Sequence, residues 1–397
     1  MSLTKVTYAM IEGEVVNVLD FGAVGDGVAN DTAAIAAALA SVLSTGGTVY
    51  FPQGTYLTDS IDLRAFTNIT LLGENDATQF QYKPTSVIKI RTACAVGVQT
   101  SNTGTEVPAT AGTGIVIKNL FINANSLATV GVNCQRAIYI YNCAVKNAIE
   151  DGILFEGGSY PIELENVVSQ NNGRDGLRVK APFTTVYNIR NCEFGFNDGN
   201  GVTIFDGSTC VFENVLCQTN TGNGFYIERQ DPAGFTQPIF LERLTFIGCY
   251  TEANDGYGLY VTSYNTTPST FTGKIVDLTF INCSFNSGVA QEAYIRGTTT
   301  PTVIGSPYIG AALDPLYNTI QLNNYIIQGN LLLRNNQLRF VDSAGVYNDV
   351  RWLVGTGSPE GVVAGAVGSL FTRTDGGAGT TLYVKESGAL TVGWVAK

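Results

Sequence analysis

A repeat of 23 to 25 residues in the middle of the chain constrains its fold more than any other feature. Each unit contains an alternating strand, an Asn, a small apolar residue, a polar stretch, an Asp-Gly or Asn-Gly pair and a second alternating strand. The Asn positions, separated by 24, 25 and 23 residues, are Asn142, Asn166, Asn191 and Asn214. The glycine positions, with the same separations, are Gly152, Gly176, Gly201 and Gly224. Two landmarks that share one period predict a parallel β-solenoid, in which each coil stacks on the last.

Alternation within this repeat predicts which side chains face the interior of the coils. The residue after each Asn is small and apolar, and these positions are expected to form one interior column: Cys143, Val167, Cys192, Val215, Cys249 and Cys283. After each glycine, odd steps should point inward and even steps outward, because successive side chains of a strand lie on opposite faces. The eight cysteines contain no C-x-x-C pair. They are predicted to be mostly free, buried thiols that act as small hydrophobes.

Near the N-terminus, three glycines precede a segment that favours a helix. Their spacing does not match the G-x-G-x-x-G fingerprint, and the DFG triplet lacks the other kinase motifs, so a nucleotide site is not expected. The predicted helix runs from Ala33 to Leu43 and follows N-cap candidates at 30–32. Its apolar face comprises Ile35, Leu39 and Leu43. Lying over the first coil, this helix would close the open end that a solenoid must cover.

Both ends of the chain resemble parts of one class of proteins. The segments VNVLDFGAVGDGVANDTAAIAAAL, GGTVYFPQGTY and ITLLGEN resemble the start of pectate-lyase-like right-handed β-helix proteins, and are most similar to those of bacteriophage tail spikes and tail fibres. The sequence from Gly357 resembles short modules at the C-termini of phage tail proteins. This resemblance implies a homotrimer mounted on a virion tail with other tail proteins, assembled in the host cytoplasm. It also implies binding, and often cleavage, of a bacterial surface polysaccharide.

The predicted fold is therefore all-β: a right-handed parallel β-helix with an N-terminal capping helix and a small C-terminal β-rich module. The expected organisation is an attachment segment at 1–16, the start of the β-helix with its capping helix at 17–75, further coils at 76–322 and the module at 323–397. Asp375-Gly376 lies between two strand-like segments of that module and predicts a hairpin. Trimerisation or attachment is the expected role of the module, and a glycan-binding tip is the alternative.

Composition excludes several classes of function. The chain has no histidine, which removes Ser-His-Asp and Cys-His catalysis, His-ligated zinc and the Gly-His-Gly motif of polygalacturonase-type enzymes. A net charge of −11 is unsuited to a nucleic-acid partner, which needs a basic face. No apolar run approaches the ~20 residues that span a bilayer, so membrane insertion is not expected. The N-terminus also lacks the apolar core of a signal peptide.

The outward rows of the repeat suggest a glycan-binding face. Two steps after the glycine the row reads Leu154, Arg178, Thr203, Tyr226 and Tyr260. Four steps after it the row reads Glu156, Lys180, Phe205, Glu228 and Thr262. Aromatic rings with a few charges suit sugar recognition. The predicted substrate-binding residues are Arg178, Lys180, Tyr226, Tyr260, Phe205 and Glu156.

Three carboxylates are candidates for glycoside hydrolysis, which uses a pair of them. Glu228 is the first, and Asp206 could approach it if the chain bends at Asp206-Gly207, although a strict strand would turn Asp206 inward. Asp231 begins the loop after Glu228 and is the third. Alternatively, Arg178 and Lys180 could neutralise charge and supply the base of a lyase.

Asp151 and Asp175 precede anchor glycines, where turns favour Asp and Asn for backbone reasons. This structural interpretation is preferred, with Ca²⁺ binding as the alternative, and no other metal or cofactor is expected.

These observations favour a virion-borne polysaccharide depolymerase that acts on a capsule, exopolysaccharide or O-antigen. Endo-glycosidic hydrolysis is favoured over β-elimination. A non-enzymatic receptor-binding or structural tail fibre protein is the main alternative, and a cellular pectate lyase is a weaker one.

Overall fold

The computed structural model describes most of the chain in two compact units. The described residues are 15–74, 85–100, 113–135, 137–158, 161–229, 241–262, 275, 277–285, 293–296, 302–304, 308–309, 327–328, 337–341 and 347–397. Residues 1–14 of the predicted attachment segment lie outside them. The first unit comprises residues 1–312 and 320–329, and the second comprises 313–319 and 330–397.

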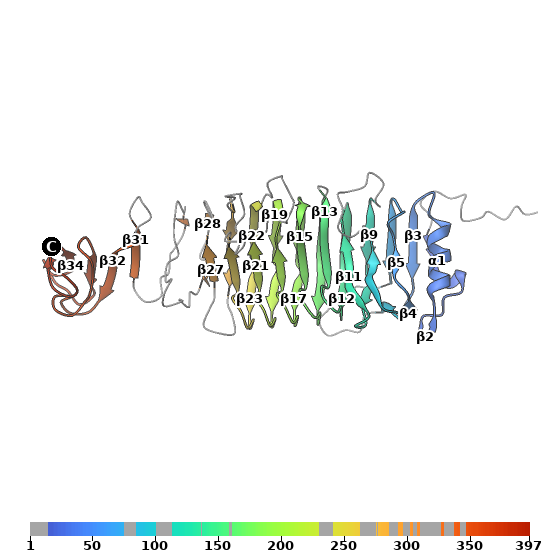
Figure 1. Cartoon of the computed structure of the whole chain (residues 1–397), viewed down its shortest axis with the longest axis horizontal. Helices are drawn as coiled ribbons and strands as arrows, with labels where there is room; N and C mark the ends of the chain where they lie inside the picture. Colours follow the sequence, from blue (N-terminus) through green and yellow to red (C-terminus); the bar gives the residue numbers. More distant parts are fainter. Residues whose placement is uncertain are drawn as a thin grey trace, which may run out of the picture. The chain divides into compact units, whose positions relative to one another are not determined.

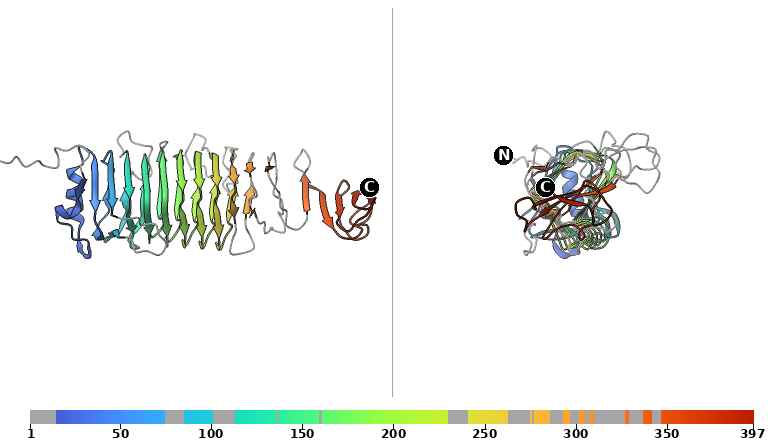
Figure 2. Two further views of the ribbon diagram at one scale, coloured as in Figure 1. Left: turned by 180° about the vertical axis from the view of Figure 1, so that it is seen from behind. Right: turned by 90° about the vertical axis from the view of Figure 1, so that its left-hand side faces the viewer.

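The first unit is a right-handed parallel β-helix, which confirms the predicted fold (Figures 1 and 2). Among the described residues, 21 strands form one sheet: β1 (Val15–Asn17), β2 (Asp26–Asn30), β3 (Gly47–Phe51), β4 (Gly54–Thr58), β6 (Ile69–Gly73), β7 (Ser86–Ile90), β9 (Ile115–Lys118), β10 (Phe121–Asn123), β12 (Ile138–Lys146), β14 (Ile162–Gln170), β16 (Tyr187–Arg190), β17 (Glu193–Gly195), β19 (Gly207–Glu213), β20 (Leu216–Gln218), β22 (Leu241–Ile247), β23 (Tyr250–Glu252), β25 (Thr279–Ile281), β26 (Ser284–Phe285), β28 (Thr302–Ile304), β29 (Tyr308–Ile309) and β30 (Ile327–Gln328). Nine form the other: β5 (Ile61–Asp62), β8 (Cys94–Gln99), β11 (Ala128–Cys134), β13 (Ile153–Gly158), β15 (Leu177–Thr184), β18 (Val202–Ile204), β21 (Phe225–Glu228), β24 (Leu259–Thr262) and β27 (Ala293–Arg296).

The strand register confirms the predicted interior. In the nine-stranded sheet Ile153 pairs with Leu177, and Val202 pairs with Phe225. The inward residues have no exposed surface: Ile153, Phe155, Leu177, Val179, Val202, Ile204, Phe225, Ile227, Leu259 and Val261. The cysteine and valine column is also buried, with no member more than 2% exposed, and Cys143 pairs with Val167. All eight cysteines are free, and all except Cys94 are buried.

Each Asn anchor makes a sharp bend between two strand segments of one coil. Asn142, Asn166, Asn191 and Asn214 have φ between 51° and 53°, a left-handed conformation that Asn tolerates better than other residues with a side chain. The side chains also form a ladder, in which Asn142 Nδ2 donates to Asn119 Oδ1 at 3.2 Å and Asn166 Nδ2 to Asn142 Oδ1 at 3.0 Å. In the following coil Gly248 takes the anchor position with φ 61°.

We expect Asn142→Ala to lower the free energy of unfolding by about 1–2 kcal/mol, because alanine would be forced into the left-handed region. Asn142→Gly should cost less than Asn142→Ala, since it loses the same ladder bonds without the strain, as Gly248 illustrates. Urea unfolding followed by far-ultraviolet circular dichroism measures both. Equal losses for the two variants would show that the ladder bonds, and not the backbone conformation, select Asn.

A second Asn ladder, which the sequence analysis did not identify, lies inside the helix. Asn172 Nδ2 donates to Asn197 Oδ1, Asn197 Nδ2 to Asn220 Oδ1 and Asn220 Nδ2 to Asn254 Oδ1, at 2.9–3.0 Å. All four residues are at most 1% exposed. Because each amide bonds to the next coil, this buried polar row is satisfied and fixes the stacking of coils.

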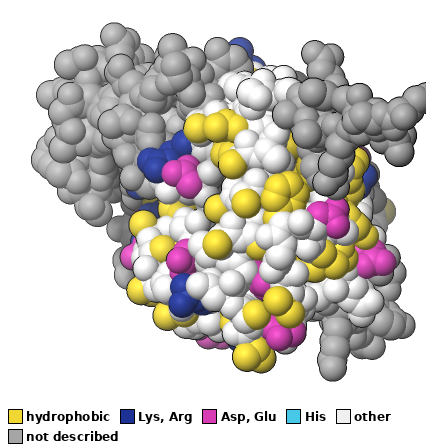
Figure 3. Space-filling view, turned by 90° about the vertical axis from the view of Figure 1, so that its right-hand side faces the viewer, with side chains coloured by type: hydrophobic (Ala, Val, Ile, Leu, Met, Phe, Trp, Pro, Cys, Tyr) yellow, Lys and Arg dark blue, Asp and Glu magenta, His cyan; other side chains and the backbone are white. Residues whose placement is uncertain are grey.

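The N-terminal cap has the predicted position, with a shorter helix. Helix α1 (Thr32–Ser41) follows the 3₁₀ helix η2 (Val18–Phe21) and buries Ile35 and Leu39. The inclusion of Leu43 in the buried face was wrong: the helix ends at Ser41, and Leu43 is 44% exposed. Figure 3 looks onto this end of the unit and shows hydrophobic side chains interspersed with scattered charges. No helix among the described residues combines the length and apolar character needed to cross a membrane.

The second unit is a small sheet: β31 (Gln337–Val341), β32 (Tyr347–Gly355), β33 (Leu370–Arg373), β34 (Leu382–Lys385) and β35 (Trp394–Ala396). β33 and β34 pair antiparallel around the Asp-Gly turn signal, as predicted. Its described core contains Leu353, Phe371, Tyr383 and Trp394.

Candidate functional site

The outer face of the nine-stranded sheet carries both rows that were predicted to point outward. Their alignment is confirmed, since Arg178 pairs with Thr203, Thr203 with Tyr226 and Tyr226 with Tyr260. Half of the row members are nevertheless buried, with 0–6% exposure: Leu154, Glu156, Thr203, Phe205 and Thr262. The expectation that Phe205 and Glu156 contact a glycan therefore does not fit this structure.

Neighbouring basic side chains cover two of these residues, Phe205 and Glu156. Arg178 lies over the ring of Phe205, with its guanidinium carbon 4.6 Å from the ring centroid. Lys180 Nζ pairs with Glu156 Oε1 at 2.9 Å, and the Lys180 side chain is itself 52% exposed. In each case a long basic side chain shields the residue of an adjacent coil and leaves its own charged end toward the surface.

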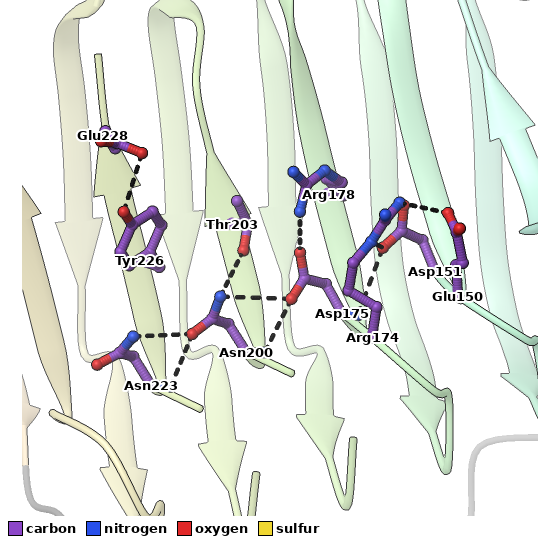
Figure 4. A network of polar contacts seen from close by, with 10 residues as sticks. All are labelled: Glu150, Asp151, Arg174, Asp175, Arg178, Asn200, Thr203, Asn223, Tyr226 and Glu228. Atoms are coloured by element: carbon purple, nitrogen blue, oxygen red, sulfur yellow. Dashed lines mark hydrogen bonds and ion pairs between the residues drawn. The ribbon is translucent and has the colours of Figure 1, made fainter. Parts of the chain in front are cut away.

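Arg178 also joins a polar row at the base of the strands (Figure 4). Its Nη1 pairs with Asp175 Oδ2 at 2.7 Å, and Asp175 is 1% exposed. Burial raises the pKa of the Asp175 carboxyl above its usual value, while Arg178 opposes that rise. The ion pair fixes the guanidinium beside Phe205 and Thr203, so Arg178 is held in place on the outer face.

The row of Asp and Asn residues before the anchor glycines has the structural role that was preferred. Asn200 N–H donates to Asp175 Oδ1 at 2.8 Å, and Asn223 N–H donates to Asn200 Oδ1 at 2.7 Å. Asp151 is fully buried and accepts two bonds from the Arg174 guanidinium. A Ca²⁺ ion would have to replace these partners, and no cluster of three or more potential metal-ligating side chains occurs among the described residues.

Tyr226 and Glu228 form a hydrogen-bonded pair on this face. Tyr226 Oη donates to Glu228 Oε2 at 2.9 Å, and both side chains are partly exposed. Burial, and then the Glu228 carboxylate, raise the pKa of the Tyr226 hydroxyl well above its ordinary value of 10. The hydroxyl therefore stays protonated at neutral pH and keeps one carboxylate oxygen oriented.

The tyrosine rings of this face stack on one another. Tyr226 and Tyr260 are parallel, with ring centroids 5.2 Å apart, and Tyr257 lies against Tyr260 at 5.4 Å. A face of each ring is already occupied, so the aromatic platform predicted from the sequence becomes a row of edges and hydroxyl groups. A polysaccharide would meet hydrogen-bonding groups here more than open ring faces.

Of the other two predicted carboxylates, Asp206 is buried and Asp231 is not among the described residues. Asp206 is 2% exposed, and it closes the turn from β18 to β19 by accepting the Gly207 N–H at 2.9 Å. Its burial follows the strand alternation, which places it inward. Asp231 lies outside the described residues. Of the two candidate carboxylates that the structure describes, Asp206 is buried and Glu228 is partly exposed.

This arrangement offers a carboxyl group that can transfer a proton, a hydroxyl that orients it and a fixed guanidinium nearby. Sequence reasoning selected Arg178, Tyr226, Glu228 and Tyr260 from their row positions. It missed Tyr257, which precedes the anchor glycine of its coil and so lay outside the two rows. The Arg178–Asp175 bond could have been suspected from the three-residue spacing of opposite charges.

Comparisons with known proteins agree with this architecture. Mannuronan C5-epimerase AlgE5 of Azotobacter vinelandii is 63% identical over 41 residues, which is 10% of this chain and 4% of that protein. The chain thus matches a small part of these curated relatives. The AlgE4 A-module of the same organism superimposes with a TM-score of 0.55 over 80% of this chain and 88% of that one, at 18% identity. The likeness at this identity concerns the fold alone.

A tailspike of Acinetobacter baumannii bacteriophage Fri1, described as a capsular polysaccharide depolymerase, gives a TM-score of 0.49 at 12% identity, over 86% of this chain and 69% of that one. The sequence model of rhamnogalacturonase A/epimerase, pectate lyase-like proteins matches residues 15–226. That match spans more than half of the chain, from the first described strand to β21. It includes the N-terminal cap and the coils that carry Arg178 and Tyr226. By this match, the chain belongs to the rhamnogalacturonase A/epimerase, pectate lyase-like family.

Proposed function

We propose that the protein binds a bacterial surface polysaccharide along the outer face of the nine-stranded sheet and cleaves it by endo-glycosidic hydrolysis. The observation that carries this proposal is the Tyr226–Glu228 pair, which holds a partly exposed carboxyl group on that face. Arg178, fixed by Asp175, and Tyr260, stacked on Tyr226, supply donors for sugar hydroxyl groups on either side of it. The family and the relatives named above are themselves described by polysaccharides or their modification.

Hydrolysis is favoured over β-elimination because Arg178 and Lys180, the bases of the two predicted rows, are both paired. Elimination needs a free base and positive charge to neutralise a uronate carboxylate. Arg178 is bound to Asp175 and Lys180 to Glu156, so their charges are largely compensated. In our proposal Glu228 exchanges a proton with the glycosidic oxygen, and Asp231 supplies the second carboxyl group that such chemistry uses, since Asp206 is buried.

The test is to incubate the protein with purified capsules, exopolysaccharides and O-antigens and to measure chain length by gel filtration. Shortened chains with new reducing ends, and without ultraviolet-absorbing unsaturated sugars, are expected. Unsaturated products would replace hydrolysis with elimination. Binding without any shortening would favour the non-enzymatic receptor-binding alternative.

A second candidate, epimerisation at C5 of a uronate polymer, is favoured by the 63% match to mannuronan C5-epimerases. In this alternative the Glu228 carboxylate would take the C5 proton, the Tyr226 hydroxyl would return one, and Arg178 would lie near the uronate carboxylate. Mannuronan incubated in deuterium oxide separates the two candidates. Epimerisation would incorporate deuterium at C5 and leave the chain length unchanged.

We further propose that the protein is carried on a virion tail as a homotrimer. The resemblance of both chain ends to tail spikes and tail proteins supports both the location on a tail and the trimeric state. An apolar surface on the second unit supports association: Trp352, Val354, Leu382 and Val395 are each 37–45% exposed. Paired strands place them on one side of the sheet, opposite the core residues Leu353, Phe371, Tyr383 and Trp394.

Trp352→Glu should dissociate the trimer, because it places a charge in the proposed apolar contact. Sedimentation velocity should give a trimeric wild type and a monomeric variant. Glu360→Gln serves as a control outside this surface and should stay trimeric. A monomeric wild type would contradict the trimer, and an associated Trp352→Glu would place the contact elsewhere.

A further inference from the structure

A hollow on the 21-stranded sheet, outside the proposed catalytic face, collects polar groups that have unused hydrogen-bonding capacity. It has a volume of about 360 Å³, which is within the usual range for small-molecule sites. The lining residues are Asn166, Val168, Asn191, Cys192, Glu193, Asn214 and Leu216. They come from three consecutive coils, at the bend made by the Asn anchors and at the start of the strand segment that follows.

Glu193 is the principal charged group of this hollow. It is 3% exposed, and its Oε1 accepts bonds from Gln170 Nε2 at 2.6 Å and Gln218 Nε2 at 2.8 Å. Its other oxygen, Oε2, is buried and has no hydrogen-bond partner among the described residues. A buried polar atom without a partner is destabilising, so a ligand that donated to it would be stabilised.

The surroundings of Glu193 keep its carboxyl group in place. Lys146 Nζ donates to Gln170 Oε1 at 2.8 Å, so the nearest cation is bound to the amide that holds the carboxyl. Gly195 leaves room for this arrangement, because a Cβ there would lie 3.2 Å from Gln218 Cγ and 3.4 Å from Glu193 Oε1. Burial raises the pKa of the Glu193 carboxyl above its usual value, and the bonds from Gln218 and Gln170 oppose that rise.

The outer Asn ladder is interrupted at the same hollow. Asn166 donates to Asn142 and Asn214 donates to Asn191, but no hydrogen bond joins Asn191 to Asn166 within the described chain. Asn191 therefore has a free amide donor and Asn166 a free carbonyl acceptor at the wall of the hollow. Val168 and Leu216 add apolar surface between these polar groups.

We infer that this hollow is a binding site for one neutral sugar unit. A pyranose presents an apolar C–H face and a rim of hydroxyl groups that both donate and accept, which matches the apolar floor and the free groups of Asn166, Asn191 and Glu193. An anionic sugar would bring a second carboxylate close to Glu193 in a chain of net charge −11. The site is independent of the proposed catalysis, since it lies on the other sheet and uses none of the same residues.

Saturation-transfer NMR with the full chain tests this inference, using the methyl glycosides of glucose, galactose, mannose and N-acetylglucosamine, with sodium galacturonate as the anionic probe. At least one neutral glycoside should bind with a Kd near about 1 mM. Glu193→Gln replaces one carboxylate oxygen, either the unpartnered Oε2 or the bonded Oε1, with an NH₂ group. This substitution should weaken the binding about tenfold. Glu163→Gln, on β14 but outside the hollow, should bind as the wild type does.

Asn191→Gly provides a second variant that keeps the backbone, since Gly248 occupies the equivalent bend, and it should also weaken binding. The inference would be overturned if no neutral glycoside bound the wild type at up to about 20 mM. Unchanged affinity in both variants, or preference for galacturonate, would overturn it as well. Glu228→Gln should leave this binding intact, so that failure of the proposed catalytic site is distinguished from failure of the hollow.

Discussion

Glu228→Gln is expected to reduce glycan depolymerisation by about 10²–10⁴-fold, the usual loss when a group that transfers a proton in the transition state is removed. Gln can still accept the Tyr226 hydroxyl through its carbonyl oxygen, so the 2.9 Å contact and the stack on Tyr260 should survive. The change should therefore appear in kcat, with KM little altered. Initial rates of reducing-end release on the polysaccharide that the protein cleaves measure both constants.

The chain contains a matched control for this substitution. Tyr250 Oη donates to Glu252 Oε2, also at 2.9 Å and also two residues apart, on β23 of the other sheet. Glu252→Gln makes the same chemical change in the same local geometry, away from the proposed site, and should leave kcat within about twofold, as expected for a surface substitution. Equal activity of Glu228→Gln and the wild type would remove Glu228 from the mechanism.

The repeat made the coil architecture predictable because each coil must place similar residues at similar positions to stack. Two landmarks with one period fixed the register, and alternation from the glycines then identified the inward rows, which the structure buries completely. The cysteine column followed from its small, apolar partners. The left-handed bends explain why Asn recurs, although the sequence analysis used these residues only as markers.

Exposure along the outer rows could not be predicted in the same way, because it depends on side chains from adjacent coils. Arg178 reaches Asp175 within its own coil and covers Phe205 of the next, so one long side chain decides the accessibility of an aromatic ring. Asp206 is buried at a turn where a bend had been proposed. Glu193 escaped notice because its neighbours in the row are apolar, and its partners Gln170 and Gln218 become apparent once the coils are stacked.

Phe246→Ala is expected to lower the free energy of unfolding of the β-helix by about 3–5 kcal/mol, through lost burial and the cavity left behind. Phe246 is fully buried and stacks between Phe212, at 4.8 Å, and Phe280, at 5.1 Å, with the edge of Phe225 at 5.4 Å. These rings come from three consecutive coils, so their neighbours are fixed by the strand register and cannot easily close the gap.

Far-ultraviolet circular dichroism should follow this unfolding, because both tryptophans, Trp352 and Trp394, lie in the second unit and their fluorescence reports on it. Phe246→Leu retains much of the volume and should cost no more than about 1.5 kcal/mol. Tyr250→Ala removes a ring that is 38% exposed, four residues along the same coil, and should cost less than about 1 kcal/mol. If Phe246→Ala and Tyr250→Ala were equally destabilising, the stacked phenylalanines would not be what holds successive coils together. The strand pairing and the Asn ladders would then have to carry that stability.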